Sequence, residues 1–174
     1  GYCGPGYASD YFEYDYDAVA GYPGEDAGLR FVGRSTLSPG KLMLYRRHVD
    51  VHSQLPPESL SVSLNVMRVD PAQGWFDQYG FDPERGTVAR WLNANASEAF
   101  LRVAVASGAD SARDYAEWVG ARHPSDRLRL ASFEARAELL ADPAEADALW
   151  RAGELSGSRM VAGAARARRA VIEG

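Results

Sequence analysis

One alternating stretch decides the fold prediction: Ser59-Leu60-Ser61-Val62-Ser63-Leu64-Asn65-Val66-Met67. Successive side chains of a β-strand point to opposite faces, so this run has an apolar wall and a small, polar wall. The pattern predicts a strand within residues 58–69. Its polar wall would face water, or it would line the inside of a small barrel, where hydroxyl and amide groups contact a ligand.

The composition limits the class of protein. A chain of 174 residues with 46% hydrophobic residues is long enough for one domain, or for one core with an appended subdomain. The net charge of −5 argues against non-specific nucleic-acid binding as the main task. Cys3 is the only cysteine, so an internal disulfide and a cysteine-built zinc site are excluded. With no apolar run long enough to span a bilayer, we expect no membrane partner and a cytoplasmic protein.

Charge is unevenly spread along the first fifty residues. Six acidic residues precede the first basic residue: Asp10, Glu13, Asp15, Asp17, Glu25 and Asp26. Five basic residues then follow: Arg30, Arg34, Lys41, Arg46 and Arg47. We expect the acidic opening and the basic strand region to pack side by side, as a mutually neutralising surface or as a basic pocket for an anionic ligand.

The second half of the chain has a helical pattern. Helix-start residues precede alanine-rich segments at Ser97, Ser111, Ser125 and Asp142-Pro143, and a last helix begins near Ser158. Strand patterns fill residues 1–95 and helix patterns fill residues 96–174, without alternation between them. This order predicts an α+β fold, with an antiparallel β-sheet in residues 1–95 and an alanine-rich helical array in residues 96–174 packed on it.

Residues 29–69 resemble part of a cupin barrel. Pro39-Gly40 is followed after eleven residues by His52, and the alternating stretch from Ser59 comes next. Cupins have a turn glycine, a metal-ligating histidine and a returning strand in this order. The usual proline and glycine are replaced by Arg46, Arg47 and His48, and the first cupin motif is absent. The resemblance therefore implies a cupin-like half barrel (a double-stranded β-helix) more than it implies a metal.

The residues suited to a metal are His48, Asp50 and His52, which share one parity of an expected strand over residues 41–52. Neighbours of the same parity would lie about 6.6 Å apart and the outer pair about 13 Å apart, so two of them would bind an ion such as divalent iron with a third ligand. The candidates for that ligand are Asp10, Glu13, Asp15 and Glu58. In the alternative, Asp50 accepts hydrogen bonds from a histidine and from Arg46 or Arg47.

These patterns together predict a pocket that binds a small molecule or a peptide. Its walls would be Arg46, His52, Ser61, Ser63 and Asn65, and its lid would be Trp75, Phe76 and Tyr79. If the chain is an enzyme, the iron would support oxygenase-type or isomerase-type chemistry, and the catalytic residues are unknown. The alternatives are a non-catalytic ligand sensor, a biosynthetic accessory protein and a structural interaction module. The tyrosine-rich start favours a homodimer.

Overall fold

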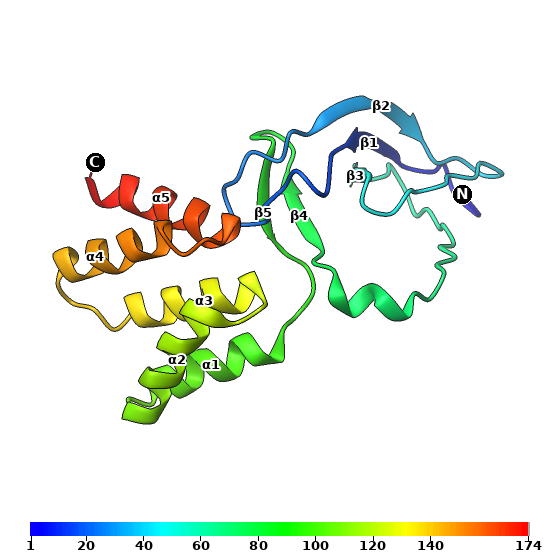
Figure 1. Cartoon of the computed structure of the whole chain (residues 1–174). Coiled ribbons are helices and arrows are strands. Elements are labelled where there is room, and N and C mark those ends of the chain that lie inside the picture. The colour runs from blue at the N-terminus through cyan, green and yellow to red at the C-terminus, as the bar shows by residue number, and fades with distance from the viewer. Residues whose placement is uncertain (174) are drawn as a thin grey trace. The chain divides into compact units, whose positions relative to one another are not determined.

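The chain has an α+β fold, with small antiparallel sheets in its first half and five helices in its second. A computed structural model describes residues 1–173 (Figure 1). The strands are β1 Ala8–Glu13, β2 Arg30–Thr36, β3 Asp50–Gln54, β4 Tyr79–Asp82 and β5 Thr87–Trp91. A 3₁₀ turn, η1, spans Pro71–Trp75, and the helices are α1 Ala96–Ala106, α2 Asp110–Arg122, α3 Asp126–Ala137, α4 Pro143–Glu154 and α5 Arg159–Glu173.

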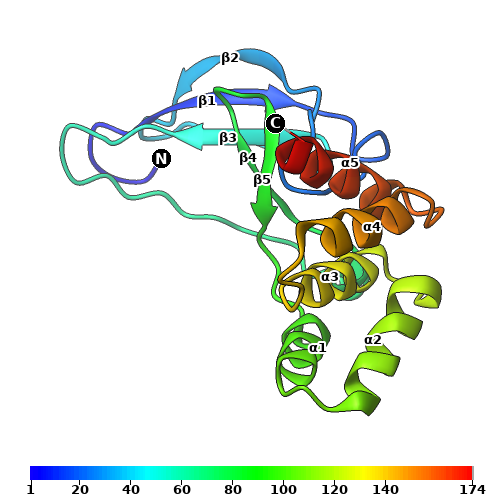
Figure 2. The same ribbon diagram turned by 90° about the vertical axis from the view of Figure 1, so that its left-hand side faces the viewer.

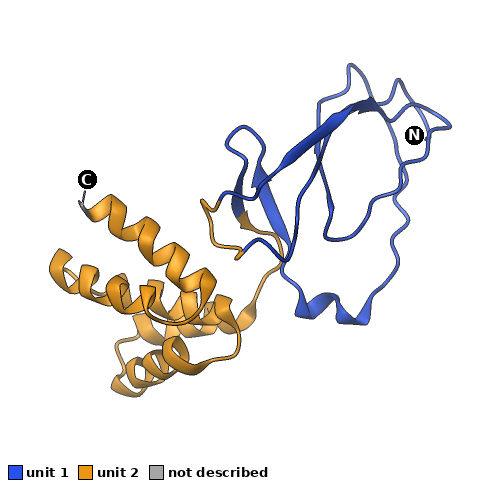
Figure 3. Ribbon diagram, turned by 45° about the horizontal axis from the view of Figure 1, so that its top comes forward, with its two compact units in different colours: residues 1–19, 26–89 blue, residues 20–25, 90–174 orange. Residues whose placement is uncertain are grey.

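Residues 1–173 divide into two compact units (Figure 3). The first unit contains residues 1–19 and 26–89, and the second contains residues 20–25 and the helices. The boundary at residues 89 and 90 lies slightly before the predicted one at 95 and 96. The sequence pattern gave no sign that residues 20–25 belong with the helices.

Strand β1 is the centre of a three-stranded antiparallel sheet in the order β2-β1-β3 (Figure 2). Its register sets acidic residues opposite basic ones: Asp10 pairs with Arg34 and Glu13 pairs with Arg30. Arg34 donates two hydrogen bonds to Asp10, at 2.6 and 2.7 Å. The predicted packing of the acidic opening beside the basic strand region is therefore confirmed, and it takes the form of ion pairs between neighbouring strands.

The predicted strand over residues 58–69 is wrong. Only Val62 in this segment forms a β-bridge, and its partner is Cys3. A β-strand needs a second strand that forms hydrogen bonds along its whole length. In the described chain this segment has such a partner at one residue. The two sheets have three and two strands, and residues 1–173 form no closed barrel. The resemblance to cupins stays a prediction.

The polar wall of this segment was expected to face water or a ligand, and the apolar wall was expected to be buried, but the structure shows a different arrangement. Ser63 Oγ lies 2.8 Å from the Tyr7 hydroxyl, and Ser61 Oγ accepts a hydrogen bond from the Gly6 amide at 3.1 Å. The polar wall thus contacts the start of the chain, whereas Leu60 and Val66 on the apolar wall are 85% and 98% exposed. Ser61 and Ser63 therefore contact the chain itself, whereas Ser59 and Asn65 of the same wall are exposed to solvent.

The expected strand over residues 41–52 is mostly irregular. Only its end belongs to β3, and His48 adopts a left-handed backbone with φ of 62°. This conformation belongs to a turn in which the Asp50 carboxylate accepts from the Arg46 amide at 2.5 Å. A strand cannot continue through a residue with positive φ, so the alternating pattern was overridden here.

Side-chain caps define the helices, as the sequence predicted for two of them. Ser125 caps α3 by accepting from the Leu128 amide, and Asp142 caps α4 by accepting from the Ala144 amide. At α1 the cap is Asn95 rather than the predicted Ser97. Helix α2 begins at Asp110 without a side-chain cap, one residue before the predicted Ser111.

Helix α3 is the centre of the helical unit because two of its faces are buried. One face, with Leu128 and Ala131, packs on apolar residues of α1 and α2, and the other, with Leu130 and Phe133, packs on α4 and α5. Residues 20–25 complete the second cluster, since Tyr22 lies against Gly163 of α5 so closely that a Cβ there would overlap the tyrosine ring. Glycine at 163 is therefore required for this contact.

A buried ion pair joins the start of α3 to α1. Arg127 is 6% exposed; its Nη2 donates to Glu98 Oε2 at 3.0 Å, and its Nε lies 2.7 Å from Glu98 Oε1. The guanidinium also donates to the Asn93 side chain at 3.1 Å and lies 4.9 Å from the centre of the Trp91 ring. Arg127 thus connects two helices and the end of β5.

We predict that Glu98→Ala lowers the free energy of unfolding by about 3–5 kcal/mol, because it leaves the buried Arg127 charge without its carboxylate. Urea unfolding measures the loss. The matched control is Glu138→Ala, since Glu138 pairs with Arg102 at 3.2 Å and its side chain is 69% exposed. That change should cost about 0–1 kcal/mol. Equal losses in the two variants would contradict the prediction.

Candidate functional site

A cavity opens where the chain leaves the three-stranded sheet after β1. Its volume is about 380 Å³, and it is lined by Tyr14, Asp15, Tyr16, Asp17, His48 and Val49. The Tyr14 amide donates to the Val49 carbonyl at 3.1 Å, which holds the two lining segments together. Asp15 then forms an Asx turn by accepting from the Asp17 amide at 3.1 Å. This turn leaves both carboxylates exposed beside the rings.

The hydroxyl group and the ring of Tyr16 are both held in place by neighbouring residues. Its hydroxyl donates to the Asp77 carbonyl at 3.2 Å and accepts from the Asp77 amide at 3.0 Å. Its ring stacks on the imidazole of His48, with centroids 4.1 Å apart and planes 14° apart. Tyr79 stacks nearby at 5.6 Å. The ring of Tyr16 is therefore a preformed surface and needs no ordering when a ligand binds.

His48 is neutral in this arrangement. Its Nε2 accepts a hydrogen bond from Arg47 Nε at 2.9 Å, so the ring proton is on Nδ1. Burial, followed by the positive charge of Arg47, lowers the pKa of His48 from its ordinary value. The Arg47 guanidinium itself stacks on the Phe76 ring at 4.5 Å and forms an ion pair with Asp70.

The tyrosines around the cavity also stay neutral. Burial raises the pKa of Tyr14 to about 12 and raises the pKa of Tyr16 as well. Neutral phenol and imidazole rings offer the electron-rich faces that attract cations. The formal charges that line the cavity are then those of Asp15 and Asp17.

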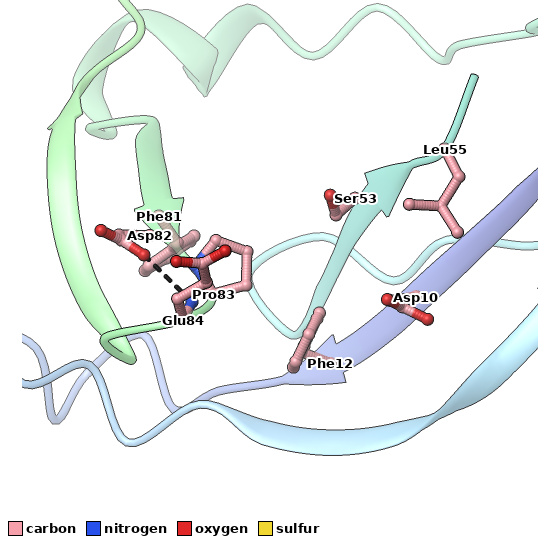
Figure 4. Close-up of a pocket in the computed structure, with 8 residues that line it drawn as sticks. All are labelled: Asp10, Phe12, Ser53, Leu55, Phe81, Asp82, Pro83 and Glu84. Carbon is pink, nitrogen blue, oxygen red and sulfur yellow. Dashed lines mark hydrogen bonds between the residues drawn. The ribbon is translucent and has the colours of Figure 1, made fainter.

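A second, larger groove of about 510 Å³ lies between the sheet and the β4–β5 hairpin (Figure 4). Asp10, Phe12, Ser53 and Leu55 line one side, and Phe81, Asp82, Pro83 and Glu84 line the other. Asp10 is neutralised by Arg34, whose hydrogen bond lowers the pKa of this carboxyl group. Asp82 accepts from the Glu84 amide at 3.0 Å, which closes the hairpin turn.

The predicted ligand-binding residues do not line a common cavity in the described structure. Arg46 is exposed and pairs with Glu13 and Asp50, while Ser61 and Ser63 contact Gly6 and Tyr7. Asn65 is exposed, Trp75 is 88% exposed, and Tyr79 packs in the ring cluster beside Tyr16 and Phe81. Tyr79 is thus the predicted residue that lies nearest to the cavity lining. A role for these residues in binding stays a prediction.

The predicted metal ligands His48, Asp50 and His52 are also separated. Both carboxylate oxygens of Asp50 accept from Arg46, and the His52 ring lies tilted against Tyr45, with centroids 4.7 Å apart. No three histidine, cysteine or acidic side chains within residues 1–173 are placed to hold an ion together. The described conformation does not assemble this ligand set, so a divalent metal such as iron stays a prediction that metal analysis of the purified protein tests.

The sequence analysis singled out His48 and Asp15 but missed the cavity formed with Tyr14, Tyr16 and Asp17. Aromatic and acidic residues alternate over residues 11–17, a pattern typical of one continuous strand. The strand ends at Glu13, and the Asx turn at Asp15 is the reason. An aspartate followed by a second aspartate two residues later is a turn signal that would have found this end.

We predict that stability falls as the pH drops below the ordinary histidine pKa of 6.5, because His48 must then be protonated. The folded-state pKa is lowered, so the stabilisation is fully present above the ordinary value of 6.5 and is lost as the pH falls through the folded-state pKa. Thermal melting of His48→Asn, which tolerates the left-handed backbone, should show a weaker dependence on pH than the unmodified chain. His123→Asn in the helical unit is the control, and parallel curves for His48→Asn and the unmodified chain would refute the prediction.

No described helix is long and apolar enough to cross a membrane. Comparison with known proteins gives no relative from which a function could be transferred: no family model, no curated protein and no solved structure matches this chain.

Proposed function

We propose that this chain is a non-catalytic binding module for a small molecule or a peptide that carries a cationic group, bound at the cavity around Tyr16 and His48. The observation that carries the proposal is the pairing of two exposed carboxylates with preformed ring faces in one cavity. A volume of about 380 Å³ lies within the usual range of about 300–1,000 Å³ for ligand sites.

The two carboxylates give the cavity a preference for positively charged groups. Asp15 and Asp17 lie on one turn, and they are the only residues of the lining with a formal charge at neutral pH. A bound ammonium or guanidinium group would be attracted by both, and the net charge of −5 adds a long-range term of the same sign. An anionic ligand would be repelled by the same groups.

The rings add a second contribution to cation binding. Tyr14 presents a neutral phenol ring, and a cation over a tyrosine face gains about 0.5–1 kcal/mol at an exposed site. Neutral His48 adds no competing charge. Arg47, the nearest cation, is engaged with Phe76 and Asp70.

The second groove supports the same class of ligand. It combines Asp82 and Glu84 with Phe12 and Phe81, so it repeats the combination of acidic and aromatic groups. A peptide with more than one basic residue would use both cavities of this unit, whereas a small cation needs only the first. The cationic group is common to both classes of ligand.

The proposal predicts that a fluorescent hexa-arginine peptide binds and that a hexa-glutamate peptide does not. Fluorescence anisotropy should show about tenfold weaker binding of hexa-arginine to the double variant Asp15→Asn/Asp17→Asn, which corresponds to about 1.4 kcal/mol. Added salt should weaken binding to the unmodified chain, because the carboxylates are exposed.

The control variant Asp114→Asn/Glu117→Gln removes the same two charges from α2, and it should keep the affinity of the unmodified chain within about twofold. Equal weakening in both double variants would mean that hexa-arginine responds to net charge alone. That result, or binding of hexa-glutamate, would overturn the proposed function.

A further inference from the structure

The apolar wall of residues 58–68 is exposed at three of its four apolar positions and partly covered at Val62, which is 38% exposed. Leu60, Leu64 and Val66 are 85%, 74% and 98% exposed, while Ser61 and Ser63 on the opposite wall contact the start of the chain. Proteins rarely expose an alternating apolar row on an extended segment, because such a row is a template for pairing with another chain. The segment therefore has the character of an interface.

One backbone edge of this segment is open. The N–H of Val62 donates to the Cys3 carbonyl at 2.9 Å, and its C=O accepts from the Cys3 amide at 3.2 Å. Backbone groups of successive residues in an extended chain point to opposite edges. Those of Ser61 and Ser63 therefore point away from Cys3, and in the described structure they form no backbone hydrogen bond to another segment.

The charges of the segment select its partner. Glu58 and Arg68 have the same sequence parity as Leu60 and Val66, and both are exposed. Residues 58 and 59 form a bend, so the pairing below requires them to straighten. An antiparallel second copy, related by a two-fold axis at Ser63, sets Glu58 opposite Arg68 of that copy and Leu60 opposite its Val66. We propose that two copies of this chain associate by antiparallel pairing of residues 58–68 about a two-fold axis at Ser63.

The open edge requires the same register. In this pairing the hydrogen-bonded positions are the odd residues, whose backbone groups point to the open edge, and the even residues form the non-hydrogen-bonded pairs. Side chains are closest in such pairs, with Cα atoms about 4.5 Å apart, so Val62 packs on Leu64 of the second copy. A slip of two residues sets Glu58 opposite Val66 in one direction and opposite Asp70 in the other, and both ion pairs are lost.

Charge reversal tests the register. Glu58→Arg sets arginine opposite arginine twice in each dimer, and Arg68→Glu sets glutamate opposite glutamate twice. Each change should weaken the dimer about tenfold in sedimentation equilibrium. An equimolar mixture of the two variants should return to the affinity of the unmodified chain, because the heterodimer has opposite charges at both pairs. Glu117→Arg on α2 is the control and should leave the dimer unchanged.

Cross-linking tests the geometry in a Cys3→Ser background. Leu60→Cys and Val66→Cys chains should form a disulfide with each other when they are mixed and oxidised. Neither should cross-link to itself, since like positions lie about 20 Å apart in this register. A monomeric protein would overturn the proposal. A dimer that the charge reversals leave unchanged would also overturn it, because the association would then use another surface. If the main product were Leu60→Cys chains linked to each other, the register would be wrong.

Discussion

Ion pairs between the acidic residues of β1 and the basic residues on its two flanking segments set the register of the three-stranded sheet, on which the rest of the first unit is built. Asp10 and Glu13 of β1 meet Arg34 and Arg30 of β2, and Glu13 also binds Arg46 before β3 at 2.5 Å. Exposed ion pairs such as these stabilise a protein by about 0–1 kcal/mol each, so their main effect is on register. A shift of β1 by one residue would set the carboxylates on the other face of the sheet. The strand ends at Glu13, before the Asx turn at Asp15, and the cavity begins at that point.

Local signals predicted the helical half well and the β half poorly. Ser125 and Asp142 act on amides two or three residues away, so a single sequence contains everything needed to place α3 and α4. The alternation at residues 59–67 indicates that the segment suits a strand, but the neighbour of a strand comes from elsewhere in the chain or from another chain. The cavity needs residues 14–17 beside His48, a contact that alternation along one segment cannot predict.

At the cavity, the contacts that each side chain makes differ from those that the residue types alone suggest. Histidine beside aspartate indicates a metal ligand, and for residues 48–52 the sequence left a metal site and a hydrogen-bond network around Asp50 as alternatives. In the structure His48 accepts from Arg47 and stacks on Tyr16, so its nitrogen and its ring face are both engaged. Asp50 is likewise bound by Arg46. The acidic groups that line the cavity are Asp15 and Asp17, and both are exposed.

The contact between Tyr22 and Gly163 has a consequence for the order in which the protein is built. Tyr22 precedes all five described helices along the chain, and α5, which receives it, is the last of them. The cluster around Phe133 and Trp150 therefore stays open on one side until translation has passed residue 163. Closing such a distant loop is slow compared with forming the helices themselves. Docking of residues 20–25 is then a late step in the folding of the helical unit.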